Sequence, residues 1–286
     1  MTPSTARSST RVIGFDLARA VAVFGMVVVN FKIAMGASDN GPTWLVDLVG
    51  LLEGRAAATF VVLAGVGVAL MTRRARLDGD LVRLAAARRR LLRRAGLLFV
   101  VGLAYTPIWP ADILHFYGVY LAIAALVLAA PTRHLAASAL GLMSLFMVLL
   151  FTLDYERGWD WETLHYDGFW TFDGMVRHLF FNGFHPVIPW LAFVFVGMIL
   201  GRMDLADRAV RRRVLAWSVG TAAAAELTSR ALVSVLSTGA DPADAEVIAA
   251  VFGSAPMPPT LLYMIAGCAT ACAIIAAAVA IGERWP

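Results

Sequence analysis

Acidic and basic side chains stand in pairs within or beside the long apolar runs of this sequence. Glu53 and Arg55 lie two positions apart, immediately before an apolar run that contains no charge until Arg73. A carboxylate or guanidinium near hydrocarbon is costly unless it is paired or faces water, so such residues mark either a clasp between helices or a polar cavity. Two further pairs have the spacing of neighbours on a helix: Asp16 and Arg19 are three positions apart, and Glu226 and Arg230 are four apart. Each pair is predicted to form an ion pair within its own helix.

The pairs near the outer ends of the apolar runs favour a shared cavity. Glu53 is expected to hold Arg55 so that its guanidinium faces this cavity and binds an anionic or carbonyl group. Asp112, one helical turn before His115, is expected to contribute to the same binding site. A direct clasp between Arg55 and Asp112 is the alternative. Under the cavity hypothesis, Arg55→Ala abolishes ligand binding without unfolding the bundle.

The stretch FFNGFHPVIPWLAFVFVGMILGRM, residues 180–203, places a histidine beside two prolines at the start of an apolar run. Pro186 and Pro189 leave backbone carbonyls unpaired, which is tolerated at membrane depth only where the backbone lines protein or a water-filled cavity. The imidazole of His185 has a titration range suited to proton transfer; the alternative is a hydrogen-bonded interfacial histidine. Asn182 and Trp190 of the same stretch are predicted to bind substrate.

Composition predicts that these residues sit in a membrane. Sixty per cent of the 286 residues are hydrophobic, 15% are charged, and the mean hydropathy is +0.74. A helix needs ~20 mostly apolar residues to cross the hydrocarbon core. The sequence therefore predicts an all-α polytopic transmembrane bundle, residues 1–286 forming one domain. The expected spans number about eight: 12–34, 48–71, 92–109, 113–130, 135–153, 187–201, 214–236 and 259–281.

The distribution of basic residues orients this predicted bundle. With eight spans, one set of connections and termini carries 18 basic residues, nine of them arginines in 73–94. The opposite set carries only Arg157 and Arg177. The positive-inside rule then places both termini in the cytoplasm of a multi-pass cell-membrane protein. The bilayer accounts for the net charge of +4, and no nucleic-acid partner is expected.

Common catalytic and metal-binding signatures are not found in the sequence. It has no phosphate-binding loop, nucleophile elbow or H-E-x-x-H motif, and its five histidines lack ligand spacing, so no metal is expected. Cys268 and Cys272 are interpreted as small core residues. The outer loop 154–182 is rich in Trp, Tyr and acids, which favours an interfacial aromatic belt over a carbohydrate platform.

Several motifs resemble the heparan-α-glucosaminide N-acetyltransferase-like family of transmembrane acyltransferases. That family typically opens with R-x-x-x-x-D-x-x-R-G-x-A and closes the first helix with Asn, which matches Arg11, Asp16, Arg19 and Asn30. The similarity continues through the EGR segment with AGVGVAL, through DILHFYGVY, and through NGFHPVIPWLAFVFVGMILGR. The chain ends at GERWP after the last predicted span, where relatives run on for further spans; a truncated sequence and a shortened homologue both stay open.

The resemblance implies transfer of an acetyl group from cytoplasmic acetyl-CoA, or another acyl-CoA, to an extracytoplasmic acceptor such as a cell-envelope sugar amine or hydroxyl. It implies that Asn30 contributes to substrate binding and that the arginines of 73–94 suit the CoA phosphates, although topology explains them equally well. The family's catalytic histidine would fall at Gly36. Asp39, His115 and His185 are therefore the candidate bases, and the sequence does not choose among them.

A second class of function stays open. A transporter or small-molecule binder would use the same polar cavity without chemistry. Transporters often contain repeated halves with broken helices at corresponding positions, and no such repeat is visible in the sequence. The acyltransferase is the preferred hypothesis for this reason. Whether the protein forms a homodimer is left open.

Overall fold

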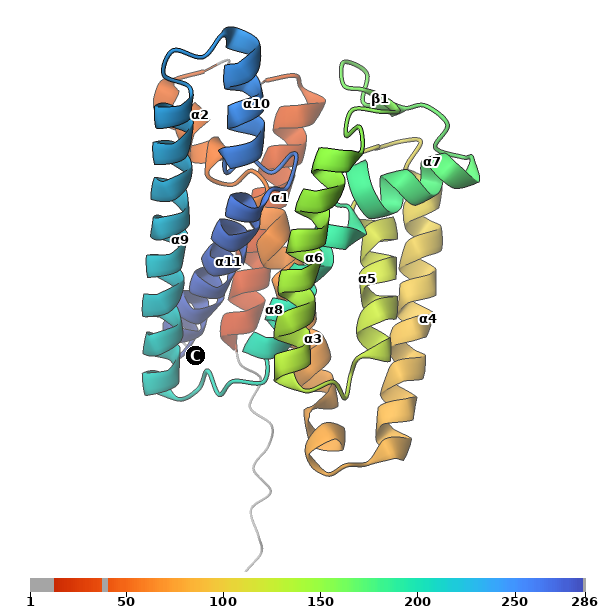
Figure 1. The fold of residues 1–286 in the computed structure, drawn as a ribbon. Helices are drawn as coiled ribbons and strands as arrows, with labels where there is room; N and C mark the ends of the chain where they lie inside the picture. Colours follow the sequence, from red (N-terminus) through yellow and green to blue (C-terminus); the bar gives the residue numbers. More distant parts are fainter. Residues whose placement is uncertain (1–12, 38–40, 285–286) are drawn as a thin grey trace, which may run out of the picture.

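The computed structural model describes residues 13–37 and 41–284, which form a bundle of helices with a small outer cap (Figure 1). The helices are α1 (Ile13–Ala34), α2 (Thr43–Gly50), α3 (Arg55–Leu77), α4 (Leu81–Tyr105), α5 (Leu114–Leu126), α6 (Thr132–Thr152), α7 (Phe172–Arg177), the π-helical turn η1 (His178–Asn182), α8 (Val187–Leu200), α9 (Arg208–Leu236), α10 (Pro242–Phe252) and α11 (Leu261–Gly282). Two short antiparallel strands, β1 (Trp159–Asp160) and β2 (His165–Tyr166), form a hairpin in the cap.

The all-α membrane architecture predicted from the sequence is confirmed, but a count of eight spans is not. Among the described residues, five segments are long and apolar enough to cross a membrane, and the bent pair 172–182 with 187–200 makes a sixth. Helix α4 does not have the composition of a membrane span, because its first 14 residues carry six arginines. Helix α5 is too short to cross a membrane, because its 13 residues rise only ~20 Å and the hydrocarbon core is ~30 Å thick.

The two described ends of the chain meet at one end of the bundle. A Cβ atom built on Gly282 would lie 2.8 Å from the backbone nitrogen of Gly14, so α1 and α11 approach closely there. The arginine-rich turn between α3 and α4 and the start of α9 lie at this same end (Figure 1). This arrangement fits the expected clustering of basic residues; which side of a membrane that end faces stays a prediction.

Helix α3 lies at the centre of the bundle because small residues let neighbouring backbones approach it. A Cβ on Gly197 of α8 would lie 2.0 Å from the Val62 carbonyl oxygen, and one on Gly65 would lie 2.1 Å from the Val194 carbonyl oxygen. Gly65 and Gly197 therefore mediate close helix packing. Gly67 does not, since nothing lies within 4 Å of an added Cβ there.

The outer cap is built from residues 153–182, which follow α6. Trp159 and Trp161 stack with ring centroids 4.3 Å apart, and the β1–β2 hairpin pairs Trp159 with Tyr166. Helix α7 and the π-helical turn then lead into α8, with a bend of 47° between the two segments. The backbone at this break does not form regular helical hydrogen bonds. His185 lies in the break, between η1 and α8.

Candidate functional site

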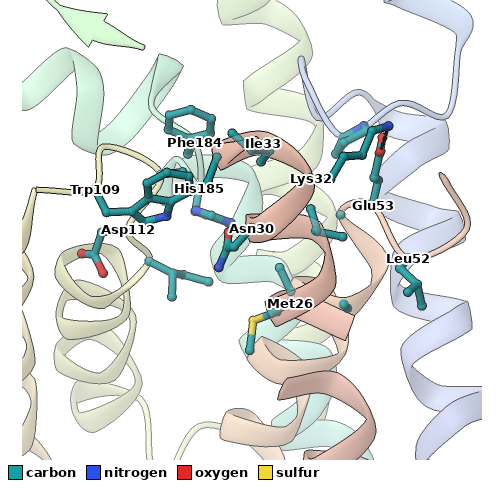
Figure 2. A pocket seen from close by; sticks show the side chains of 18 of the residues that line it. Met26, Asn30, Lys32, Ile33, Leu52, Glu53, Trp109, Asp112, Phe184 and His185 are labelled. Atoms are coloured by element: carbon teal, nitrogen blue, oxygen red, sulfur yellow. Dashed lines mark hydrogen bonds and ion pairs between the residues drawn. The ribbon is translucent and has the colours of Figure 1, made fainter. Parts of the chain in front are cut away.

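A cavity of about 590 Å³ opens at the end of the bundle opposite the arginine-rich turns. Its walls come from the last third of α1, the turn before α3, the connection between α4 and α5, the break before α8, and residues 256–257. Figure 2 shows Asn30 of α1, His185 and Trp109 facing the same space, while the Asp112 carboxylate is turned toward the start of α5. Five polar or charged side chains line it: Asn30, Lys32, Glu53, Asp112 and His185.

Glu53 pairs with Lys32 across the cavity mouth, not with Arg55. The Lys32 ammonium donates to the Glu53 carboxylate at 2.6 Å, and the two side chains are 23% and 32% exposed. The expectation that Glu53 holds Arg55 is wrong. The cause is Gly54, whose φ of +66° breaks the helical backbone between α2 and α3, so that the two neighbouring side chains point to different helices.

Arg55 forms an ion pair with Glu226 in the middle of α9, and it is not among the residues lining the cavity. The second oxygen of the Glu226 carboxylate accepts a hydrogen bond from the Ser254 hydroxyl at 2.8 Å. The expected intrahelical pair between Glu226 and Arg230 is therefore wrong, as is the clasp between Arg55 and Asp112. Arg230 is exposed, whereas Arg55 presents its guanidinium to Glu226 from a partly buried position at the start of α3.

Asp112 and His115 form a second polar unit at the first turn of α5. One carboxylate oxygen accepts from the backbone N–H groups of Leu114 and His115 at 3.0 and 3.3 Å, and it lies 3.0 Å from Nδ1 of His115. The His115 ring is only 1% exposed, and its Nε2 has no hydrogen-bond partner among the described residues. Asp112 reaches the cavity, whereas His115 points into an aromatic layer with His178, 5.6 Å away between ring centroids.

His185 lies in the cavity wall, held from two sides. Its backbone carbonyl accepts a hydrogen bond from the Tyr120 hydroxyl at 2.5 Å, and its ring packs edge-on against Trp190 at 4.6 Å. Within the described chain, Nδ1 of His185 is buried without a partner. Trp190 is 1% exposed, is not among the residues that line the cavity and supports the His185 ring, while its predicted role in substrate binding stays a prediction.

The side-chain amide of Asn182 makes hydrogen bonds that hold the cap together. Its amide nitrogen donates to the carbonyls of Tyr155 and Arg157 at 2.8 and 2.9 Å, and its side-chain oxygen accepts from the Tyr166 hydroxyl at 2.8 Å. Burial raises the pKa of Tyr166, which keeps that phenol protonated as a donor. Asn182 is 0% exposed and is not among the residues that line the cavity, and its predicted role in substrate binding stays a prediction.

Comparison with known protein families agrees with the sequence motifs. The family model described as heparan-alpha-glucosaminide N-acetyltransferase, catalytic, matches residues 11–232. This chain belongs to that family. The match runs from α1 into α9 and so includes Asn30, Glu53, Asp112 and His185. Neither curated proteins nor solved structures give a match to the chain.

Membership in the N-acetyltransferase family indicates a membrane protein with transmembrane acetyltransferase-like function, of the kind that uses acetyl-CoA as donor. The other predicted residues lie away from the cavity or outside the described chain. Asp16 and Arg19 form an ion pair of 2.8 Å within α1, near its inner end. Asp39 lies outside the described residues. Over residues 13–37 and 41–284, no group of three or more acidic, His or Cys side chains could hold a metal ion.

Sequence reasoning missed partners that come from distant parts of the chain. Lys32 of α1, which pairs with Glu53, and Ser254, which donates to Glu226, are two such partners. Lys32 carried a usable signal, because it is the only lysine in the sequence and stands at the end of an apolar run. Ser254 carried none, because its contact with Glu226 depends on how α10 folds back onto α9.

Proposed function

We propose that this protein transfers an acetyl group from acetyl-CoA to an amine or hydroxyl acceptor bound in the outer cavity. Family membership supports the reaction type, and His185 in the cavity wall is the observation that supports the location. The histidine combines a cavity-facing ring, a backbone fixed by Tyr120 and a nearby carboxylate at Asp112. A positioned neutral imidazole with a free ring nitrogen can accept a proton as a general base.

In the proposed reaction, His185 accepts the proton from the acceptor amine or hydroxyl. The acceptor lone pair attacks the thioester carbonyl carbon, the new C–N or C–O bond forms, and the C–S bond breaks. The proton held by the histidine then passes to the departing CoA thiolate. The amide of Asn30 and the ammonium of Lys32 are the cavity donors available for the carbonyl oxygen as it gains negative charge.

The acyl donor is proposed to bind at the arginine-rich end. Within the described residues, Nε of Arg76 and Nε of Arg202 are both buried without a hydrogen-bond partner. Burial and the neighbouring Arg76 guanidinium lower the pKa of Arg202, which places two cations together without a carboxylate between them. Guanidinium groups bind phosphate oxygens well, so this pair suits the CoA phosphates.

The proposed transfer has a long path. Arg76 lies 21 residues beyond Arg55 in α3, about 30 Å along the helix axis. Between the two ends, Tyr120, Trp190 and Phe193 are packed with 0–1% exposure. The thioester must therefore pass between helices to reach the cavity, and the bent junction before α8 is the element placed to open that route.

Transport or simple binding is the second candidate function. It is favoured by the 47° break before α8, because broken helices beside a central site are common in transporters. The two candidates differ in one product. Acyl transfer releases free CoA thiol in proportion to acetylated acceptor, whereas transport moves the ligand unchanged.

The test uses the full chain in nanodiscs, with acetyl-CoA and glucosamine as donor and acceptor. Free thiol is followed with a chromogenic reagent, and His185→Gln is compared with His134→Gln, a matched change at an exposed histidine. Loss of a general base lowers the rate by about 10²–10⁴-fold, so His185→Gln should lose activity while His134→Gln retains it. Equal thiol release by both variants would contradict the assignment of the base. Melting-temperature shifts with acetyl-CoA and CoA, but not ATP, would support the donor independently.

A further inference from the structure

The outer cavity is not closed by helix packing on one side. Helix α1 packs against α3 and α11, and within the described residues it makes no packing contact of comparable extent with α4 or α5. The cavity lies in the interval between these elements (Figure 2). Its rim there carries Phe31 of α1 and Tyr105 of α4, which are 63% and 42% exposed.

The lining of the cavity changes in polarity with depth. Its charged and amide groups sit near the outer ends of the helices, where Lys32 and Glu53 form their pair. Met26 lies four residues before Asn30 in α1, about 6 Å deeper. Ala56 and Ala57 continue the apolar wall below Glu53. The cavity thus has a polar mouth and an apolar floor, in the same order as the headgroup and tail of a lipid in the adjacent leaflet.

We propose that the cavity binds an amphiphile, with a primary amine or hydroxyl headgroup on a hydrocarbon tail, which enters from the outer leaflet between α1 and the α4–α5 pair. Its role as acetyl acceptor rests on the proposed function. The headgroup lies among Asn30, Asp112 and His185, and the tail covers the apolar floor. A fully polar sugar would leave its deeper hydroxyls against apolar walls without hydrogen bonds, which is costly.

The mouth also matches a zwitterionic headgroup. Lys32 supplies a cation for a phosphate, and Glu53 supplies a carboxylate for an amine. Both side chains are partly exposed, so a ligand can share each charge without breaking a fully buried pair. Phosphatidylethanolamine has this charge pattern together with a primary amine, which makes it a suitable probe.

The experiment measures binding without acetyl transfer. The full chain in phosphatidylcholine nanodiscs is irradiated with trace phosphatidylethanolamine that carries a diazirine in its acyl chain, and the labelled peptides are mapped by mass spectrometry. Labelling is expected at the cavity-lining parts of 26–34 and 109–113, and excess unlabelled phosphatidylethanolamine should suppress it. Unsaturable labelling spread evenly over the lipid-facing surface of α1 would overturn the proposal.

Paired variants test the route of entry. Val29→Trp fills the cavity from α1 and should reduce saturable labelling about tenfold or more, because overpacking excludes the tail. Val27→Trp is the matched control, since Val27 is exposed and does not line the cavity. Ile113→Trp fills the opposite wall and should give the same loss if Val29→Trp folds poorly. Undiminished labelling in both cavity variants, with intact melting transitions, would exclude this entry.

The outcome is separable from that of the proposed function. Acetylation of soluble glucosamine without saturable lipid labelling would leave the acetyltransferase standing and refute the amphiphile. Saturable labelling without acetylation of any amine would support amphiphile binding and remove its role as acceptor.

Discussion

The ion pair between Arg55 and Glu226 allows a quantitative prediction. Arg55→Met should destabilise the bundle because it leaves the Glu226 carboxylate partly buried with only Ser254 as a donor. Breaking a fully buried pair costs 3–5 kcal/mol, whereas an exposed pair is worth less than about 1 kcal/mol. The Arg55 and Glu226 side chains are 15% and 27% exposed, so an intermediate loss of about 2 kcal/mol is expected.

The assay is thermal unfolding in detergent, followed by the fluorescence of a thiol-reactive dye on the two partly buried cysteines, Cys268 and Cys272. For chains of 150–250 residues, 1 kcal/mol corresponds to roughly 2–4 °C, so Arg55→Met should melt about 4–8 °C lower. Arg230→Met is the matched control on the exposed side of α9 and should shift the melting temperature by less than about 2 °C, as surface substitutions do.

A double variant separates a pair from two independent effects. Arg55→Met combined with Glu226→Leu replaces both charges by apolar groups and should recover part of the loss, with a coupling energy of about 1–3 kcal/mol. Equal losses for Arg55→Met and Arg230→Met, or strictly additive losses in the double variant, would refute the reasoning. Loss of acetyl-CoA binding in a fully stable Arg55→Met protein would return Arg55 to the binding site.

Three other substitutions test the cap, the helix contact and the cavity mouth. Asn182→Ala leaves buried carbonyls unpaired and should cost about 2–3 kcal/mol, detected as faster proteolysis within the outer loop. Gly197→Ala should lower the melting temperature strongly because its Cβ would lie 2.0 Å from a carbonyl oxygen, whereas Gly67→Ala should change it little; equal effects would contradict this account. Lys32→Met removes the partner of Glu53 and should lower stability by about 1 kcal/mol. Adding Glu53→Gln to the same chain should partly relieve this loss. No change in the melting temperature of Lys32→Met would mean that the pair is not formed.

Hydropathy predicted the positions of helices that are apolar along their whole length. The first and last expected spans, 12–34 and 259–281, correspond to α1 at Ile13–Ala34 and α11 at Leu261–Gly282. The third was placed at 92–109, whereas α4 runs from Leu81 to Tyr105. Hydropathy responds to side chains, and an arginine-rich first half hides a helix whose backbone pairing is continuous.

The short helix α10 was missed although the sequence contains its start signal. Asp241 precedes Pro242, and its carboxylate accepts from the backbone N–H of Asp244. An acidic residue before proline at the first helical position is a standard helix start. These residues lie between the predicted spans 214–236 and 259–281, and their polar and turn-forming types favour a connection over a helix.

The sequence identified the charged residues correctly but gave the wrong partners for Glu53, Arg55 and Glu226. Spacing along one helix predicts only local neighbours, and it did so correctly for Asp16 with Arg19, which form their ion pair in α1. Glu226 has a local candidate at Arg230 and a distant one at Arg55, and the distant one forms the contact. The choice depends on how α3 and α9 are packed, which no spacing rule contains.

The segment Glu53–Gly54–Arg55 explains why an acid and a base stand at the start of an apolar helix. The left-handed conformation of Gly54 lets its two neighbours serve different helices, so Glu53 binds Lys32 of α1 while Arg55 binds Glu226 of α9. The turn is closely packed, because a Cβ on Gly54 would lie 2.6 Å from the Tyr263 hydroxyl, which donates to the Gly54 carbonyl. One pair therefore faces the cavity and can respond to a ligand, while the other fixes α3 against the bundle. It follows that neutralising Glu53 should alter ligand binding at small cost in stability. Neutralising Arg55 should lower the stability of the bundle and leave ligand binding largely unchanged.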